Sequence, residues 1–143
     1  MTAQERETVL TLTALDHVVL NVRDVEASAA WYERVLGMTR HDFTPAYGVA
    51  RTSMKFGSMM LNLRPADMDK AAWFTGAEAV AGSDDLCFLT DASPDAVLRH
   101  LASCGVEVEV GPVSRRGARG EMTSVYCRDP DGNLIEIAKY PSP

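Results

Sequence analysis

The chain has 143 residues, of which 46% are hydrophobic, and its formal net charge is −6. This length fits one compact domain, and the hydrophobic fraction is sufficient for a core. The negative charge argues against nucleic acid or an anionic membrane as the main partner. No apolar run approaches the length of a membrane span.

Three cysteines, Cys87, Cys104 and Cys127, form no Cys-x-x-Cys pair, and residues 1–8 carry charges of both signs without the apolar stretch of a signal peptide. Both features are typical of a protein made and kept in a reducing compartment. We therefore expect a cytoplasmic protein with small buried thiols.

The first half of the chain predicts the order β-α-β-β-β. Residues 15–22 alternate as a strand does, and a helix is expected between a capping Asp24 and the terminating Gly37. Strands are then expected near 38–44, 47–56 and 58–64. Residues 65–83 form a long connection with one helical turn predicted around Met68 to Phe74; it could act as a lid, a dimer contact or a crossover.

The second half predicts the same order again. A strand over 85–90 precedes Ser93-Pro94, a helix start, and Gly105 ends that helix. Strands are expected near 106–113, 121–128 and 133–138, with a type I turn at Asp129-Pro130-Asp131-Gly132.

The two halves are copies of one unit. The offset from His17 to Asp85 equals the offset from Gly37 to Gly105, and the last predicted strands, 58–64 and 133–138, also correspond. A duplicated unit whose copies carry different polar residues at equivalent strand positions suggests a site between the copies. In each strand the apolar residues that face a helix occupy one side. The opposite side carries four polar residues at equivalent places: His17, Asn62, Asp85 and Glu136.

Three stretches carry a family resemblance: Leu15 to Val22, Trp31 to Met38, and Arg128 to Ile137. They resemble the vicinal oxygen chelate superfamily, which includes glyoxalase I, bleomycin-resistance proteins and extradiol dioxygenases. Gly111-Pro112-Val113 and Ser124-Val125-Tyr126 further resemble the branch of glyoxalase-domain-containing protein 5. The resemblance implies an α+β fold in which two tandem β-α-β-β-β units, about 13–64 and 84–139, form an incomplete barrel around a cavity. It also implies a homodimer.

The same resemblance implies a metal site. His17 matches the histidine of the first strand in this superfamily, and Glu136 matches the glutamate of the last strand. Asp85 and Asn62 depart from the pattern of glyoxalase I, where histidine and glutamate stand. The four residues would bind a divalent ion (Mn, Fe, Ni, Zn or Mg), and one nitrogen with two carboxylates favours the harder ions. The alternative is that His17 and Glu136 only form hydrogen bonds inside a polar pocket.

These residues lead to three functional hypotheses for a small-molecule substrate or ligand. The first is a glyoxalase-like lyase or isomerase, with Glu136 as metal ligand and proton shuttle. The second is a metal-free binding or sequestering protein of the resistance type, and the third is an iron(II) dioxygenase. Without a metal, Asp85 and Glu136 could still act as general acid and base.

Two arginines are candidates for binding an anionic group of the substrate. Arg64 follows Asn62 on the same side of its strand and could hold a carboxylate, or could pair with Asp85 or Glu136. Arg119 belongs to a basic, glycine-rich loop, Arg115 to Gly120, that could receive an anion or be a solvated hairpin tip.

Overall fold

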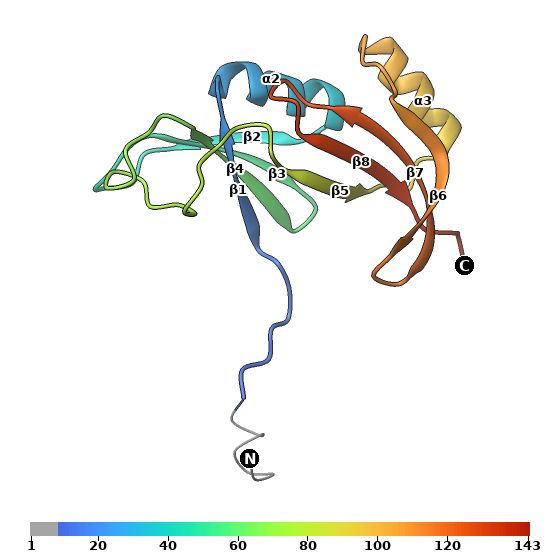
Figure 1. The fold of residues 1–143 in the computed structure, drawn as a ribbon, viewed down its shortest axis with the longest axis horizontal. Coiled ribbons are helices and arrows are strands. Elements are labelled where there is room, and N and C mark those ends of the chain that lie inside the picture. Colours follow the sequence, from blue (N-terminus) through green and yellow to red (C-terminus); the bar gives the residue numbers. More distant parts are fainter. Residues whose placement is uncertain (1–8) are drawn as a thin grey trace.

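The computed structural model describes residues 9–143 and contains two β-α-β-β-β units side by side, as Figure 1 shows. The elements of unit one are β1 (His17–Val22), α2 (Val25–Leu36), β2 (Thr39–Phe43), β3 (Arg51–Phe56) and β4 (Met59–Pro65). The elements of unit two are β5 (Asp85–Leu89), α3 (Pro94–Ser103), β6 (Val110–Gly117), β7 (Gly120–Arg128) and β8 (Leu134–Lys139). The predicted fold class and the duplication are confirmed.

Each unit forms one open four-stranded sheet. The strand order is β1-β4-β3-β2 in unit one and β5-β8-β7-β6 in unit two. In both sheets the first strand lies parallel to the last strand of its unit, and the other pairs are antiparallel. The helices lie on one side of the sheets and leave the other side open (Figure 1). No helix within residues 9–143 is long and apolar enough to cross a membrane.

The helix ends follow the local sequence. The side chain of Asp24 accepts a hydrogen bond of 3.0 Å from the backbone N–H of Ala27, and Ser93 Oγ accepts one of 3.2 Å from that of Ala96. Each bond satisfies one donor that the first helical turn leaves unpaired. Gly37 ends α2 with φ of 67°, a conformation that glycine adopts without steric cost.

The core lies between the helices and the sheets. Buried side chains from α2, α3 and both sheets form one cluster, so the two units share a single core. Tyr32 and Leu101 from the helices and Leu20, Leu63 and Ile135 from the strands are at most 1% exposed. The sheets also touch directly, because the rings of Phe56 and Phe88 lie 5.3 Å apart in an edge-to-face arrangement.

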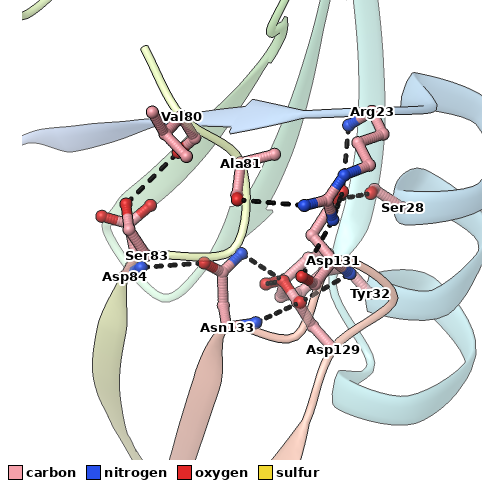
Figure 2. Close-up of polar contacts among 10 residues, drawn as sticks. All are labelled: Arg23, Ser28, Tyr32, Val80, Ala81, Ser83, Asp84, Asp129, Asp131 and Asn133. Atoms are coloured by element: carbon pink, nitrogen blue, oxygen red, sulfur yellow. Dashed lines mark hydrogen bonds and ion pairs between the residues drawn. The ribbon is translucent and has the colours of Figure 1, made fainter. Parts of the chain in front are cut away.

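A buried polar cluster joins the units, and we call it the inter-unit clasp (Figure 2). Tyr32 Oη on α2 donates a 2.7 Å hydrogen bond to Asp129 Oδ2, in the turn between β7 and β8. Asn133 donates to the same carboxylate through its backbone N–H and its side-chain amide, at 2.9 and 2.8 Å. Arg23 reaches the neighbouring Asp131 from the end of β1. The clasp therefore fixes α2 against the turn of the other unit.

Two local predictions differ from the structure, and a third is confirmed. The strand expected over 106–113 is β6, which begins at Val110 and continues to Gly117 because the hairpin turn lies at Gly117–Gly120. The helical turn predicted around Met68 to Phe74 is present, since the Trp73 N–H donates to the Asp69 carbonyl at 2.9 Å, four residues earlier, as in an α-helix. Cys87 is exposed and only Cys127 is buried, although small buried thiols were expected.

Candidate functional site

The open side of each sheet carries the predicted site residues. On β4, Leu61 and Leu63 face the helix side and Asn62 points the other way; on β8, Ile135 is fully buried and Glu136 lies on the open side. Leu61, Leu63 and Ile135 belong to the core cluster, which leaves Asn62 and Glu136 on the opposite sides of their strands. The structure adds the surroundings of each side chain.

His17 and Asn62 lie on the open face of unit one. His17 begins β1, and its Nδ1 is 2.8 Å from Oδ2 of Asp16 while 43% of its side chain is exposed. With Nδ1 held by a carboxylate, Nε2 is the ring nitrogen that remains for a ligand. Asn62 is buried, and its Oδ1 accepts a 2.6 Å hydrogen bond from Ser53 Oγ.

Asp85 and Glu136 lie together in unit two. They line a cavity of about 330 Å³ on the open face of the second sheet. The other residues that line this cavity are Glu109, Val110, Arg115, Tyr126, Arg128 and Leu134. We call it the Glu136 cavity. On β8, Glu136 lies between its cross-strand neighbours Cys87 of β5 and Tyr126 of β7.

Neutral groups surround the carboxylate of Glu136. Ser124 Oγ donates a 2.6 Å hydrogen bond to its Oε2. Although part of Cys87 is exposed, partial desolvation of its thiol by the surrounding sheet, together with the nearby negative charge of Glu136, raises the pKa of Cys87 to about 11. Burial also raises the pKa of Tyr126, with the Glu136 charge acting in the same direction and a hydrogen bond from Arg115 opposing it. Cys87 and Tyr126 are therefore both protonated near neutral pH. Within residues 9–143, Glu136 has no ion-pair partner.

Two arginines beside Glu136 are fixed by their own contacts. Arg115 Nε donates to Tyr126 Oη at 3.1 Å, and its guanidinium carbon lies 5.5 Å from the centroid of that ring. Arg128 pairs with Glu109 at 3.1 Å. Sequence analysis did not select Arg115, Tyr126 or Ser124 as site residues. The alternation of β7 could have found Ser124 and Tyr126, whereas placing Arg115 required the correct limits of β6.

Arg64 is a correction, since the prediction placed it against a substrate or an acidic side chain. The residue has no exposed surface. Its guanidinium donates to the backbone carbonyls of Met68 (2.6 Å), Trp73 (3.2 Å) and Pro65 (3.3 Å), and to Asn21 Oδ1 (2.8 Å). The connection 66–83 thus folds over this end of the sheet and uses Arg64 to hold itself in place.

Arg119 lies at the exposed tip of the β6–β7 hairpin. Its backbone N–H donates to Tyr140 Oη at 3.0 Å, and its guanidinium carbon lies 4.5 Å from the centroid of the Tyr140 ring. Arg119 does not line the Glu136 cavity.

One chain does not bring the four predicted metal ligands together. The space between the units is an apolar hollow of about 370 Å³, lined by residues that include Phe56, Met60, Leu86 and Phe88. Glu136 lines a different cavity, and residues 9–143 of a single chain contain no group of three or more His, Cys, Asp or Glu side chains arranged to hold a metal ion. The described residues of one chain therefore do not by themselves form the predicted metal site, and the set of His17, Asn62, Asp85 and Glu136 stays a prediction.

Comparison with known proteins places this chain and its fold in a family. The family model of the Glyoxalase/Bleomycin resistance protein/Dioxygenase superfamily matches residues 14–137. Virulence protein STM3117 of Salmonella typhimurium is 38% identical over 126 residues, which cover 88% of this chain and 83% of that protein.

Solved structures agree with that match. Integron cassette protein VCH_CASS1 from the mobile metagenome of V. cholerae is 38% identical with a TM-score of 0.85, covering 93% of this chain and 99% of that one. A lactoylglutathione lyase from Agrobacterium tumefaciens is 25% identical with a TM-score of 0.67, covering 90% of this chain and 95% of that one. The chain belongs to the glyoxalase/bleomycin resistance protein/dioxygenase superfamily.

Proposed function

We propose that the protein binds a small, polar carbonyl compound in the Glu136 cavity and catalyses a proton transfer on it, as a glyoxalase-like lyase or isomerase. The observation that carries the proposal is the state of Glu136, a half-buried carboxylate that only neutral donors contact. A carboxylate that lines a cavity and is not tied up in an ion pair can take a proton from a substrate bound there.

The neighbouring groups suit the charge changes of such a reaction. Ser124 donates a hydrogen bond to Oε2 of Glu136. The other oxygen, Oε1, would therefore take a proton from the carbon next to the carbonyl of the substrate. Negative charge would then develop on the carbonyl oxygen of the substrate. Tyr126 accepts a hydrogen bond from Arg115, and its O–H lies beside Glu136; once the carboxylate takes the proton, this O–H would turn to the oxygen and stabilise its charge. In a substrate with a hydroxyl on the carbon that loses its proton, transfer of that hydroxyl proton to the charged oxygen and return of the Glu136 proton to the former carbonyl carbon would complete an isomerisation.

We also propose that a second copy of the chain completes the site. β1 and β5 lie at the edges of their sheets, with no partner strand on their outer sides among the described residues. Residues 9–15 extend away from the body of the molecule (Figure 1), and Leu10 and Leu12 are about 80% exposed. An apolar segment beside an apolar hollow favours association, and a two-fold partner would bring the His17 face toward the Glu136 face.

The test is catalysis by the purified protein and its variants. The hemithioacetal of methylglyoxal and glutathione is a suitable first substrate, because the lyase from Agrobacterium tumefaciens shares this fold. A set of small hydroxy- and keto-acids, followed by NMR for exchange of the proton next to the carbonyl, extends the search. We expect Glu136→Gln to lower turnover about 100-fold or more, the range of general base catalysis. Glu121→Gln, an exposed glutamate on β7, should leave turnover unchanged.

The two other hypotheses give different results in the same experiments. A sequestering protein would bind the compounds and gain thermal stability without exchange of any substrate proton. A dioxygenase would consume oxygen with catechols after iron loading. Absence of proton exchange with every compound, in a protein that binds them, would reject the proposed chemistry.

A further inference from the structure

Two arginines lie side by side on the open face of unit one. In the pairing of β3 with β4, Ser53 faces Asn62 and Thr52 faces Leu63, so the next step places Arg51 opposite Arg64. Directly opposed side chains on one face of an antiparallel pair are about 5 Å apart at their Cβ atoms. Both guanidinium groups contact Trp73, so the two cations lie near each other, and they repel each other unless an anion lies nearby.

Within the part of the chain that the structure describes, neither arginine has an acidic partner. The ion pairs of residues 9–143 involve other arginines and His17. Arg64 is bonded to neutral acceptors only, three carbonyls and one amide, and these leave its positive charge in place. In a chain of net charge −6, this pair is a local positive site.

Arg51 is held in a fixed orientation. Its guanidinium carbon lies 4.2 Å from the centroid of the Trp73 ring, a stacking distance. The indole is itself fixed, since Trp73 is 3% exposed and its carbonyl accepts a hydrogen bond from Arg64. The long connection thus supplies an aromatic platform for one arginine and backbone acceptors for the other.

The donors of Arg51 are not used by the protein. Its Nε is buried and has no hydrogen-bond partner, and no bond from its other nitrogens to residues 9–143 is found. Buried donors are nearly always paired in native proteins, so an enclosed guanidinium nitrogen without a partner indicates a missing acceptor. Ser53, two residues along β3, and His41, its partner on β2, lie on the same face. Phe43 is the partner of Arg51 on β2, and the His41 ring stacks on that of Phe43 with the centroids 6.2 Å apart.

We propose that Arg51, stacked on Trp73, binds the carboxylate or phosphate group of a small molecule. A guanidinium presents paired N–H donors in a plane, which matches two oxygens of such a group, and stacking removes the cost of orienting it. This site lies in unit one and is separate from the Glu136 cavity of unit two. The inference goes beyond the proposed function, because anion binding at Arg51 does not require catalysis at Glu136.

The experiment uses the whole chain labelled with 15N and follows the Nε–H signals of its arginines during titration. Acetate and inorganic phosphate are the two probes, each added at constant ionic strength set with sodium chloride. We expect the Arg51 signal to shift in a saturable way with at least one probe, and the probe that binds more tightly identifies the oxygen group. The signal of Arg99, which is exposed on α3, serves as the internal reference.

The matched variants are Arg51→Gln and Arg99→Gln, which remove the same charge. Arg51→Gln should weaken binding about tenfold or more, since it removes a charge-assisted contact, whereas Arg99→Gln should change Kd by less than about twofold. Arg51→Lys should bind more weakly than the parent, because lysine keeps the charge but loses the planar donors. If Arg51→Gln does not fold, the proposal is still tested in the parent protein, by comparing the shift of the Arg51 signal with that of the Arg99 signal. Equal, non-saturating shifts of both signals would overturn the proposal, as would unchanged binding by Arg51→Gln.

Discussion

The inter-unit clasp gives a quantitative test of how the two units are held together. Replacing Tyr32 with Phe removes only the hydroxyl that donates to Asp129 at 2.7 Å and keeps the ring that packs in the core. A hydrogen bond to a charged group contributes roughly 1.5–3 kcal/mol, because the alternative partner, water, cannot reach a buried carboxylate. Asp129 is 5% exposed and keeps its bonds from Asp131 and Asn133, so we expect a loss of about 2 kcal/mol.

The assay is reversible unfolding by urea and by heat. For a domain of this size, a loss of about 2 kcal/mol lowers Tm by roughly 4–8 °C. Tyr47→Phe is the control, since Tyr47 is 96% exposed and the same substitution there should change stability by less than about 0.5 kcal/mol. If Tyr32→Phe unfolds at the same urea concentration as the parent protein, the Tyr32–Asp129 bond does not stabilise the joined units and the reasoning is wrong.

Four further predictions concern charge, metal and assembly. Replacing Glu136 with Gln removes a negative charge that helps to raise the pKa of Cys87. Alkylation of Cys87 at pH 8, measured by mass spectrometry, should therefore become faster. An unchanged rate would mean that desolvation alone raises the pKa of Cys87. Arg40 holds the pKa of Glu26 below its usual 4.5, so its contribution to stability is present at neutral pH and is lost as pH falls through the folded-state pKa. In Arg40→Gln the Glu26 carboxyl should titrate nearer 4.5 by NMR, and no shift would contradict the pairing. Metal analysis of protein purified without chelators should find a divalent ion only in the dimer. The reason is that residues 9–143 of one chain contain no group of three or more His, Cys, Asp or Glu side chains arranged to hold a metal ion. A monomer that contains the metal would refute this prediction. Leu12→Asp should weaken the dimer in light scattering, whereas Thr13→Asp, a more polar position in the same segment, should do so less.

Much of the fold could be predicted from sequence because its signals are local. The caps at Asp24 and Ser93 and the alternation in β4 and β8 depend on neighbours within a few residues. The limits of β6 were less predictable, because Gly111-Pro112 resembles a strand end while the turn lies at Gly117–Gly120. The limits of β6 are set by its pairing with β7, and a local sequence pattern carries no information about that pairing.

The candidate site was predicted only in part, for a related reason. The alternation of residues predicts that Asn62 and Glu136 lie on the open faces. It does not predict the path of the connection 66–83, which covers Arg64 and leaves Arg51 partly exposed. That path has no periodic pattern in the sequence. The relation of His17 to Glu136 depends on how the two units, and two chains, are oriented, which no spacing within one unit specifies.

The position of the clasp has a consequence for how this protein can change. Tyr32, Asp129 and Asn133 sit among the helices and turns, whereas Glu136 and Arg51 occupy the opposite side of the strands. Mutations that redesign ligand recognition can therefore accumulate without disturbing the bonds that join the halves. Such a separation of anchoring from recognition explains in physical terms how one duplicated scaffold comes to serve unrelated chemistries.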